Sequence, residues 1–134
     1  MEADVVFNSV TFAYPNREDV FSDLNLRIGG GQVTGVVGST GSGKTTLVRM
    51  LLRFVEPDTG GIKWLNEDIS KWKLKSLRES ISLVDQHITL FPTSILENIR
   101  YGMESADDQA VRRAAAIAEA VSYTHLTLPT KRIV

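Results

Sequence analysis

Hydrophobic and polar residues alternate in two stretches near the N-terminus. The runs "VVFNSVTFAY" (residues 5–14) and "LNLRIGGGQ" (24–32) place apolar side chains near every second position, and the polar turn "PNRED" separates them. Because successive side chains of a strand point to opposite faces, this period predicts two half-buried antiparallel strands. The short run "IKWL" (62–65), followed by the polar turn "NED", predicts another strand.

Two other short runs are apolar almost throughout. These are "VTGVVG" (33–38) and "ISLVD" (81–85). A short, unbroken apolar run with β-branched residues is typical of a strand that is buried on both faces, as in a parallel sheet. We therefore expect both segments to be inner strands.

Helical periodicity follows the first of these runs. In residues 43–55, Leu47, Leu51 and Val55 recur at four-residue intervals, which predicts an amphipathic helix ended by the turn "EPDTGG". A second, short helix is expected over residues 73–80.

Two more helices are expected further along the chain. Ser94 is placed to cap a helix that begins "ILENIRYG", with Glu97 at the third position after it, as in a capping box. The segment "DDQAVRRAAAIAEA" (107–120) begins with acidic residues and continues with alanines, as a helix start should. Together these elements predict an α/β fold that carries an antiparallel β layer at its N-terminus.

Composition narrows the possible functions only a little. The 134 residues are 43% hydrophobic and 23% charged, which is ordinary for one globular domain or part of a larger one. A net charge of −1 marks neither a nucleic-acid binder nor a membrane-surface binder. The sequence has no cysteine, which excludes a disulfide scaffold, a thiolate metal site and a cysteine nucleophile. No apolar run approaches the roughly 20 residues of a membrane-spanning helix, so we expect no membrane span in this chain.

The strongest chemical signal is the stretch "GSTGSGKTT" (38–46). It fits the spacing G-x-x-x-x-G-K-[ST] of a phosphate-binding loop, or P-loop, and it lies between a predicted strand and a predicted helix, as this motif requires. Glycines let the backbone turn several N–H groups toward one anion, and the helix directs its positive end at the same point. This context disfavours the alternative of a chance glycine-rich turn. The residues expected to bind the phosphates are Gly38, Ser39, Thr40, Gly41, Ser42, Gly43, Lys44, Thr45 and Thr46.

Two side chains of this loop have distinct expected roles. Lys44 is placed to reach the β- and γ-phosphates as a catalytic group, and the Thr45 hydroxyl is placed to bind Mg²⁺. A P-loop alone leaves kinases, GTPases and motor-type ATPases open. Further motifs have to separate these classes.

Several other stretches, in the expected order, resemble the nucleotide-binding domain of ABC transporters of the exporter type. "VVFNSVTFAYP" resembles the family's opening strand with its aromatic A-loop, "PDTGGIKWLNEDI" its Pro-x-x-Gly-x-Ile hairpin, and "LKSLRESISLVDQHITLF" the segment that leads to the Q-loop. "LFPTSILENIRYG" resembles the stretch after the Q-loop in multidrug and lipid exporters. The resemblance covers about residues 3–120 and implies a P-loop NTPase core with ATP and Mg²⁺ as cofactors.

The resemblance assigns two more site residues. Tyr14, at the A-loop position, would stack on the adenine ring, and packing of its ring on the sheet is the alternative. Gln86, at the Q-loop position, would be catalytic and would contact Mg²⁺ or the attacking water. Asp85 departs from the family pattern, in which a smaller or neutral residue is commoner, and it adds a negative charge near the γ-phosphate side.

The resemblance also implies parts that these 134 residues do not contain. The family's Walker B Asp–Glu pair, switch histidine and Leu-Ser-Gly-Gly-Gln signature are absent from the sequence. We therefore expect residues 1–120 to be part of an ATP-binding domain that does not hydrolyse ATP by itself. In the intact exporter its partners would be a second nucleotide-binding domain and transmembrane domains, with this domain on the cytoplasmic side of the membrane and no nucleic acid bound. The alternatives are a natural short nucleotide-binding module and a soluble ABC ATPase of translation or repair, and "LFPTSILENI" disfavours the latter.

The last stretch, residues 121–134, differs in character from the rest. "VSYTHLTLPTKRIV" breaks the alanine-rich helical pattern and resembles translated sequencing-adapter runs. We expect it to be a non-native tail and exclude it from the fold prediction. A genuine variant terminus that forms a short strand is the alternative.

Overall fold

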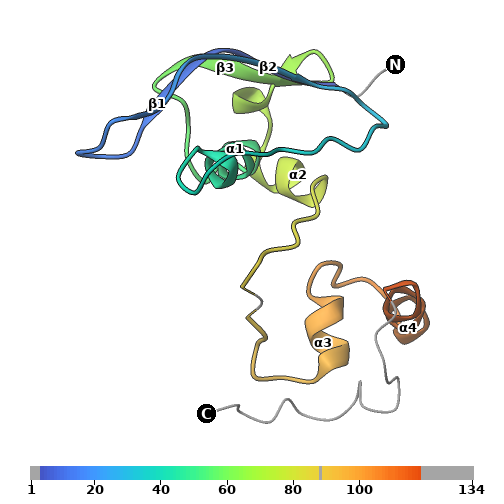
Figure 1. Ribbon diagram of the computed structural model, residues 1–134. Helices are drawn as coiled ribbons and strands as arrows, with labels where there is room; N and C mark the ends of the chain where they lie inside the picture. Colours follow the sequence, from blue (N-terminus) through green and yellow to red (C-terminus); the bar gives the residue numbers. More distant parts are fainter. Residues whose placement is uncertain (1–3, 88, 119–134) are drawn as a thin grey trace. The chain divides into compact units, whose positions relative to one another are not determined.

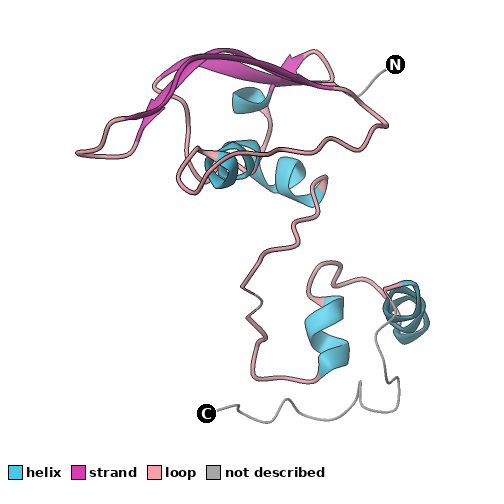
Figure 2. Ribbon diagram, in the orientation of Figure 1, coloured by secondary structure: helices cyan, strands magenta, loops and turns pink. Residues whose placement is uncertain are grey.

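The structure, a computed structural model, describes residues 4–87 and 89–118. The chain divides into two compact units, Met1–Ser82 and Leu83–Val134. Figures 1 and 2 show the strands and helices along the chain. The first unit contains a sheet and the phosphate loop, and the described part of the second contains two helices.

The first unit is built on a four-stranded sheet with the order β2-β1-β3-β4. All three neighbouring pairs are antiparallel, which confirms the predicted antiparallel layer at the N-terminus. β2 begins at the last residue of the predicted turn, because Asp19 already pairs with Ala13 of β1. The strands are β1 (Val5–Ala13), β2 (Asp19–Ile28), β3 (Thr59–Trp64) and β4 (Glu67–Asp68).

β1 departs from strict alternation at Ser9. Phe7, Val10 and Phe12 are all buried. Phe7 and Val10 are three residues apart, so in a regular strand they would point to opposite faces. The pairing with β2 shifts register between Phe7 and Val10, and Ser9 has a left-handed backbone with φ 47°. Its N–H donates to Asn25 Oδ1 at 2.9 Å instead of to the strand ladder. The bulge returns Val10 to the core face, so one extra residue preserves the apolar surface of the strand.

Helices cover one face of this sheet. They are α1 (Lys44–Leu51), the short 3₁₀ helix η1 (Ile69–Lys71) and α2 (Leu74–Glu79), and Figure 1 shows the sheet on one side and α1 and α2 on the other. The predicted helix at 73–80 is confirmed. The core between sheet and helices consists of Phe7, Val10, Phe12, Phe21, Leu47, Met50, Ile62, Ile69 and Leu77.

α1 ends at Leu51, earlier than the prediction of a helix to residue 55. The N–H of Phe54 donates to Arg49 O at 2.8 Å, and the N–H of Arg53 donates to Met50 O at 2.9 Å. Arg53 has φ 51°, so it occupies the left-handed position that usually belongs to glycine in this type of helix ending. The chain reverses here and leaves Phe54 largely exposed.

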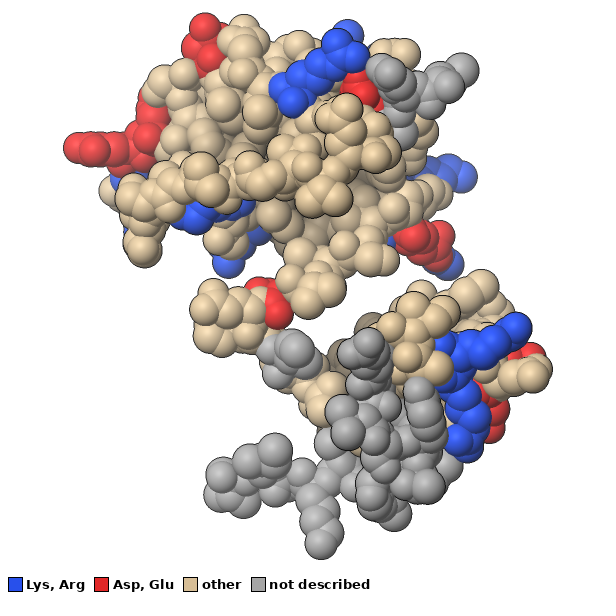
Figure 3. Space-filling view, turned by 45° about the vertical axis from the view of Figure 1, so that its right-hand side comes forward, with Lys and Arg blue, Asp and Glu red and all other residues tan. Residues whose placement is uncertain are grey.

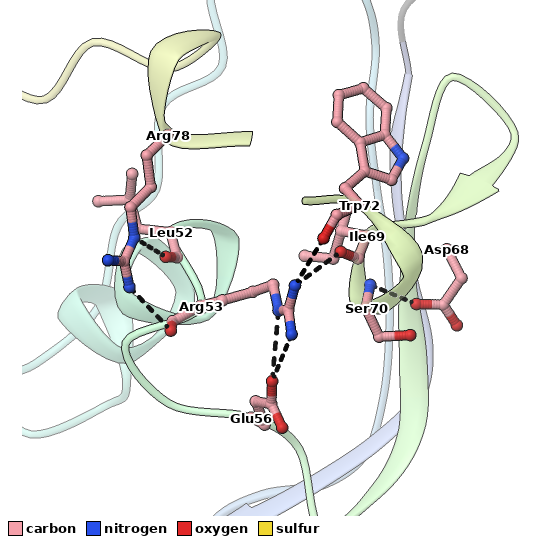
Figure 4. A network of polar contacts seen from close by, with 8 residues as sticks. All are labelled: Leu52, Arg53, Glu56, Asp68, Ile69, Ser70, Trp72 and Arg78. Carbon is pink, nitrogen blue, oxygen red and sulfur yellow. Dashed lines mark hydrogen bonds and ion pairs between the residues drawn. The ribbon is translucent and has the colours of Figure 1, made fainter. Parts of the chain in front are cut away.

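Two arginines tie the end of α1 to the following elements (Figure 4). Arg53 donates from Nη1 to the backbone oxygens of Trp72 at 3.1 Å and Ile69 at 3.4 Å. Arg78 of α2 donates from Nε to Leu52 O at 3.0 Å and from Nη2 to Arg53 O at 3.3 Å. The last carbonyls of a helix lack partners within the helix, so these bonds satisfy them and fix α2 and η1 against α1.

The β3–β4 hairpin turns at Leu65 and Asn66, which have φ 53° and 63°. The predicted turn "NED" is therefore shifted, because Glu67 already pairs with Trp64. Trp64 and Trp72 stack on each other with ring centroids 5.3 Å apart, so these two rings pack within the protein.

The two expected inner strands are not strands in this structure. Residues 33–38 and 81–85 are extended loops, and the side chains of Val33, Val37 and Val84 are almost fully exposed. A strand buried on both faces needs hydrogen-bonded strands at its edges and other layers against its faces. Within the described residues neither segment has such neighbours, so the prediction of inner strands is wrong here.

The second unit contains α3 (Ile95–Arg100) and α4 (Asp108–Ile117). The predicted cap of α3 is confirmed, because Ser94 Oγ accepts from the Glu97 N–H at 3.1 Å. A small core of Leu96, Val111 and Ala115 joins the two helices. The predicted end of the last helix at 119–120 and the expected non-native tail at 121–134 lie outside the described residues.

The described surface is mixed in charge. On the face drawn in Figure 3, basic and acidic side chains are scattered over a largely uncharged surface, in keeping with the net charge of −1. None of the helices in the described part of the chain has the length and apolar content needed to cross a bilayer.

Candidate nucleotide-binding site

The glycine loop leads directly into the first helix, as the motif requires. α1 begins at Lys44, and Gly43 is its N-cap. Gly41 and Gly43 have φ 86° and 93°, a backbone conformation that residues with a Cβ rarely adopt. These two positions therefore depend on glycine for their conformation.

Gly43 also lies closely against the sheet. A Cβ at this residue would be 2.6 Å from Phe21 Cε1 and 2.9 Å from Val20 Cγ1. Real Cβ atoms do not approach other atoms so closely, so the bare backbone allows the start of α1 to pack on β2. This contact fixes the position of the loop relative to the sheet.

The Lys44 ammonium group lies among oxygen atoms of the loop. Its Nζ donates to Gly38 O at 2.7 Å, to Ser39 O at 2.6 Å and to Ser42 Oγ at 3.3 Å. An ammonium group has three donors and no acceptor. Phosphate oxygens are acceptors that bind such a group more strongly, because they are charged. The arrangement thus fits a polyphosphate at the N-terminus of α1.

The two threonines of the first turn differ in exposure. Thr45 is exposed, so its hydroxyl is accessible to a ligand or an ion. Thr46 is 5% exposed, and its Oγ1 lies 3.3 Å from the hydroxyl oxygen of Tyr14. The Thr46 side chain therefore contacts the predicted base-binding residue rather than the loop.

Tyr14 lies near the loop although it precedes it by more than twenty residues. Its ring contacts Phe12 edge-on, with centroids 4.9 Å apart, and Arg49 Nη1 donates to its hydroxyl at 3.4 Å. The hydrogen bond with Thr46 lowers the pKa of Tyr14 below its usual value. The hydrogen bond from Arg49 and the positive charge of its guanidinium group lower this pKa further. The structure thus brings Tyr14 and Thr46 together, and it adds Arg49, which no sequence motif marked.

Gln86 belongs to the second unit, whereas the P-loop belongs to the first. Its side chain is exposed, and its backbone N–H donates to Asp85 Oδ1 at 2.6 Å. The contact of Gln86 with Mg²⁺ stays a prediction. Asp85 uses its carboxylate to hold this turn.

Comparison with known proteins places the chain in a family. A family model described as "ABC transporter" matches residues 21–133. ABC transporter B family member 13 of Arabidopsis thaliana is 41% identical over 122 residues, which are 90% of this chain and 10% of that protein. ABC transporter B family member 3 of Dictyostelium discoideum is 43% identical over 125 residues, which are 92% of this chain and 9% of that protein. The chain thus spans about a tenth of the length of these relatives.

A solved structure agrees with the sequence relatives. The structure of a bacterial Atm1-family ABC exporter with ATP bound superposes with a TM-score of 0.85 and 31% identity, over 96% of this chain and 24% of that one. The P-loop fold and the N-terminal antiparallel sheet are therefore those of an ABC ATPase domain. The chain belongs to the ABC transporter family and corresponds to its nucleotide-binding domain, of the B-family and Atm1 exporter type.

Proposed function

We propose that this chain binds Mg-ATP, as the ATP-binding part of an exporter that couples ATP hydrolysis to transport across a membrane. The observation that carries the proposal is the position of the Lys44 ammonium group, which meets three oxygen acceptors at the N-terminus of α1. Family membership supports ATP as the nucleotide.

Each part of the site has a defined task in this proposal. The backbone N–H groups of residues 38–46 and the positive end of α1 hold the phosphates, and Lys44 neutralises part of their charge. The exposed Thr45 hydroxyl is a ligand for Mg²⁺, which supplies charge neutralisation at the β- and γ-phosphates when bound. The ring of Tyr14 offers a face on which adenine stacks.

We propose that hydrolysis needs groups beyond those in these 134 residues. Phosphoryl transfer requires a group that positions the water, a carboxylate behind the metal and stabilisation of charge on the γ-phosphate. We propose that Gln86 is one of these groups and that a second nucleotide-binding domain and transmembrane domains provide the rest. In the intact exporter the domain would be membrane-associated on the cytoplasmic side. We expect the isolated 134-residue chain to release phosphate from ATP at no more than the background rate, which a phosphate-release assay measures. Turnover by the purified chain that Lys44→Ala abolishes would contradict this expectation.

A thermal-unfolding experiment tests nucleotide binding. A ligand that binds only the folded state adds about 2.7 kcal/mol of stability at a concentration about 100 times its Kd. We therefore expect Mg-ATP to raise the midpoint of thermal unfolding by several degrees, and ATP with a chelator of Mg²⁺ to raise it less. An unchanged midpoint at millimolar Mg-ATP would contradict the proposal.

A further inference from the structure

The hydroxyl of Tyr14 lies between two side chains of α1. Thr46 Oγ1 is 3.3 Å away, and Arg49 donates to the Tyr14 hydroxyl from Nη1 at 3.4 Å. Arginine can only donate, so the Tyr14 oxygen accepts this bond, while in the contact with Thr46 Oγ1 either hydroxyl can be the donor. Hydrogen bonds linked in such a chain polarise and strengthen one another.

The spacing on α1 explains why both side chains reach the same atom. Residues three positions apart on a helix lie on the same face, and Thr46 and Arg49 have this spacing. Tyr14 comes directly after β1, and the edge-on contact with Phe12 restrains its ring from the sheet side. The ring is therefore held at both ends, by Phe12 and by the pair on α1.

We infer that Arg49 is a positioning residue for nucleotide binding, which acts through the Tyr14 hydroxyl and fixes the ring for stacking with the base. The inference rests on the proposed function and extends it to the base. A ring that is already held in its binding orientation loses less conformational freedom when a ligand stacks on it. Arg49 would thus contribute to the affinity for the base and not to the affinity for the phosphates.

Two observations support this role over a purely structural one. Arg49 is exposed, so its truncation leaves no buried cavity. Thr46 and Arg49 both contact the Tyr14 hydroxyl, at 3.3 Å and 3.4 Å, and both lower its pKa. A phenylalanine at position 14 would offer the same stacking face but would have no group for Thr46 and Arg49 to hold.

The test compares Mg-ATP with Mg-tripolyphosphate, which has phosphates but no base. Calorimetric titrations use the full chain with Arg49→Ala, with Tyr14→Phe and with both changes. Each single change is expected to weaken Mg-ATP binding by about 3- to 10-fold, as for one lost hydrogen bond. Binding of tripolyphosphate should stay within about twofold, and the double variant should bind Mg-ATP about as well as Tyr14→Phe alone, because both changes remove the same contact.

Two outcomes would overturn the inference. An equal loss of affinity for both ligands in Arg49→Ala would mean that Arg49 acts on the phosphates directly. An unchanged affinity for Mg-ATP would mean that the contact has no role in binding. Arg113→Ala, at an exposed arginine of α4, is the matched control and should bind both ligands as the unmodified chain does.

A second readout needs no nucleotide. The ultraviolet titration of the Tyr14 phenol, taken as the difference from Tyr14→Phe, should move to higher pH in Arg49→Ala, because the donor that stabilises the phenolate is gone. An unchanged titration would refute the contact. If the unmodified chain binds neither ligand, the proposed function fails and this inference with it. If it binds tripolyphosphate as tightly as ATP, the inference fails alone.

Discussion

Replacement of Gly43 by alanine is expected to lower the free energy of unfolding by about 2–5 kcal/mol. A residue with a Cβ costs about 1–2 kcal/mol at a left-handed φ such as the 93° of Gly43. The new methyl would also lie 2.6 Å from the ring of Phe21, which is buried in the core, and overpacking of a core typically costs about 1–3 kcal/mol. Chemical denaturation, followed by circular dichroism, measures the loss.

Gly41 provides a matched control within the same loop. Its φ is 86°, close to that of Gly43, but a Cβ there would meet nothing within 4 Å. Gly41→Ala should therefore lose only the backbone contribution, about 1–2 kcal/mol. Equal losses in the two variants would show that the start of α1 does not pack on Phe21 as described.

Replacement of Lys44 by alanine is expected to weaken Mg-ATP binding by about 10- to 100-fold. Hydrogen bonds to charged groups contribute about 1.5–3 kcal/mol, and about 1.4 kcal/mol changes an equilibrium constant tenfold. The ammonium group is only partly buried and contacts loop oxygens, so its removal should change folding stability far less than it changes affinity. Isothermal titration calorimetry measures the affinity.

Lys75→Ala is the control for the loss of one lysine charge. Lys75 lies on α2, is largely exposed and pairs only loosely with Glu79 at 3.8 Å, an exposed contact that contributes little. We expect this variant to bind Mg-ATP as the unmodified chain does. A similar loss of affinity in both variants would mean that general charge attraction, and not the position of Lys44, accounts for binding.

Local patterns predicted the secondary structure well where neighbouring residues decide it. A strand from residue 5 and a capping serine at position 94 follow from short-range patterns, and the structure confirms both. The bulge at Ser9 was not predicted, because it interrupts the alternation. The end of α1 does not follow from its apolar stripe, because Arg53 adopts a left-handed conformation that arginine rarely takes. The bonds from Arg53 to Ile69 and Trp72, distant in sequence, hold it there.

Partners distant in sequence explain the remaining differences. The apolar runs at 33–38 and 81–85 indicate segments suited to burial, but they do not show which strands would bury them, and the described residues provide none. The P-loop could be predicted from the sequence, because the residues expected to bind phosphate lie within nine consecutive positions. The role of Arg49 could not be predicted, because its contact with Tyr14 joins residues 35 positions apart and no motif marks it.

An amide-resolved nuclear magnetic resonance titration tests the central claim most directly, since it shows where the nucleotide binds. We predict that Mg-ATP shifts the amide signals of residues 38–46 with one common saturation curve, and that Lys44→Ala moves this curve to higher ATP concentration. Saturable shifts confined to residues outside the loop, or no shifts at millimolar Mg-ATP, would contradict the assignment of this chain as an ATP-binding domain.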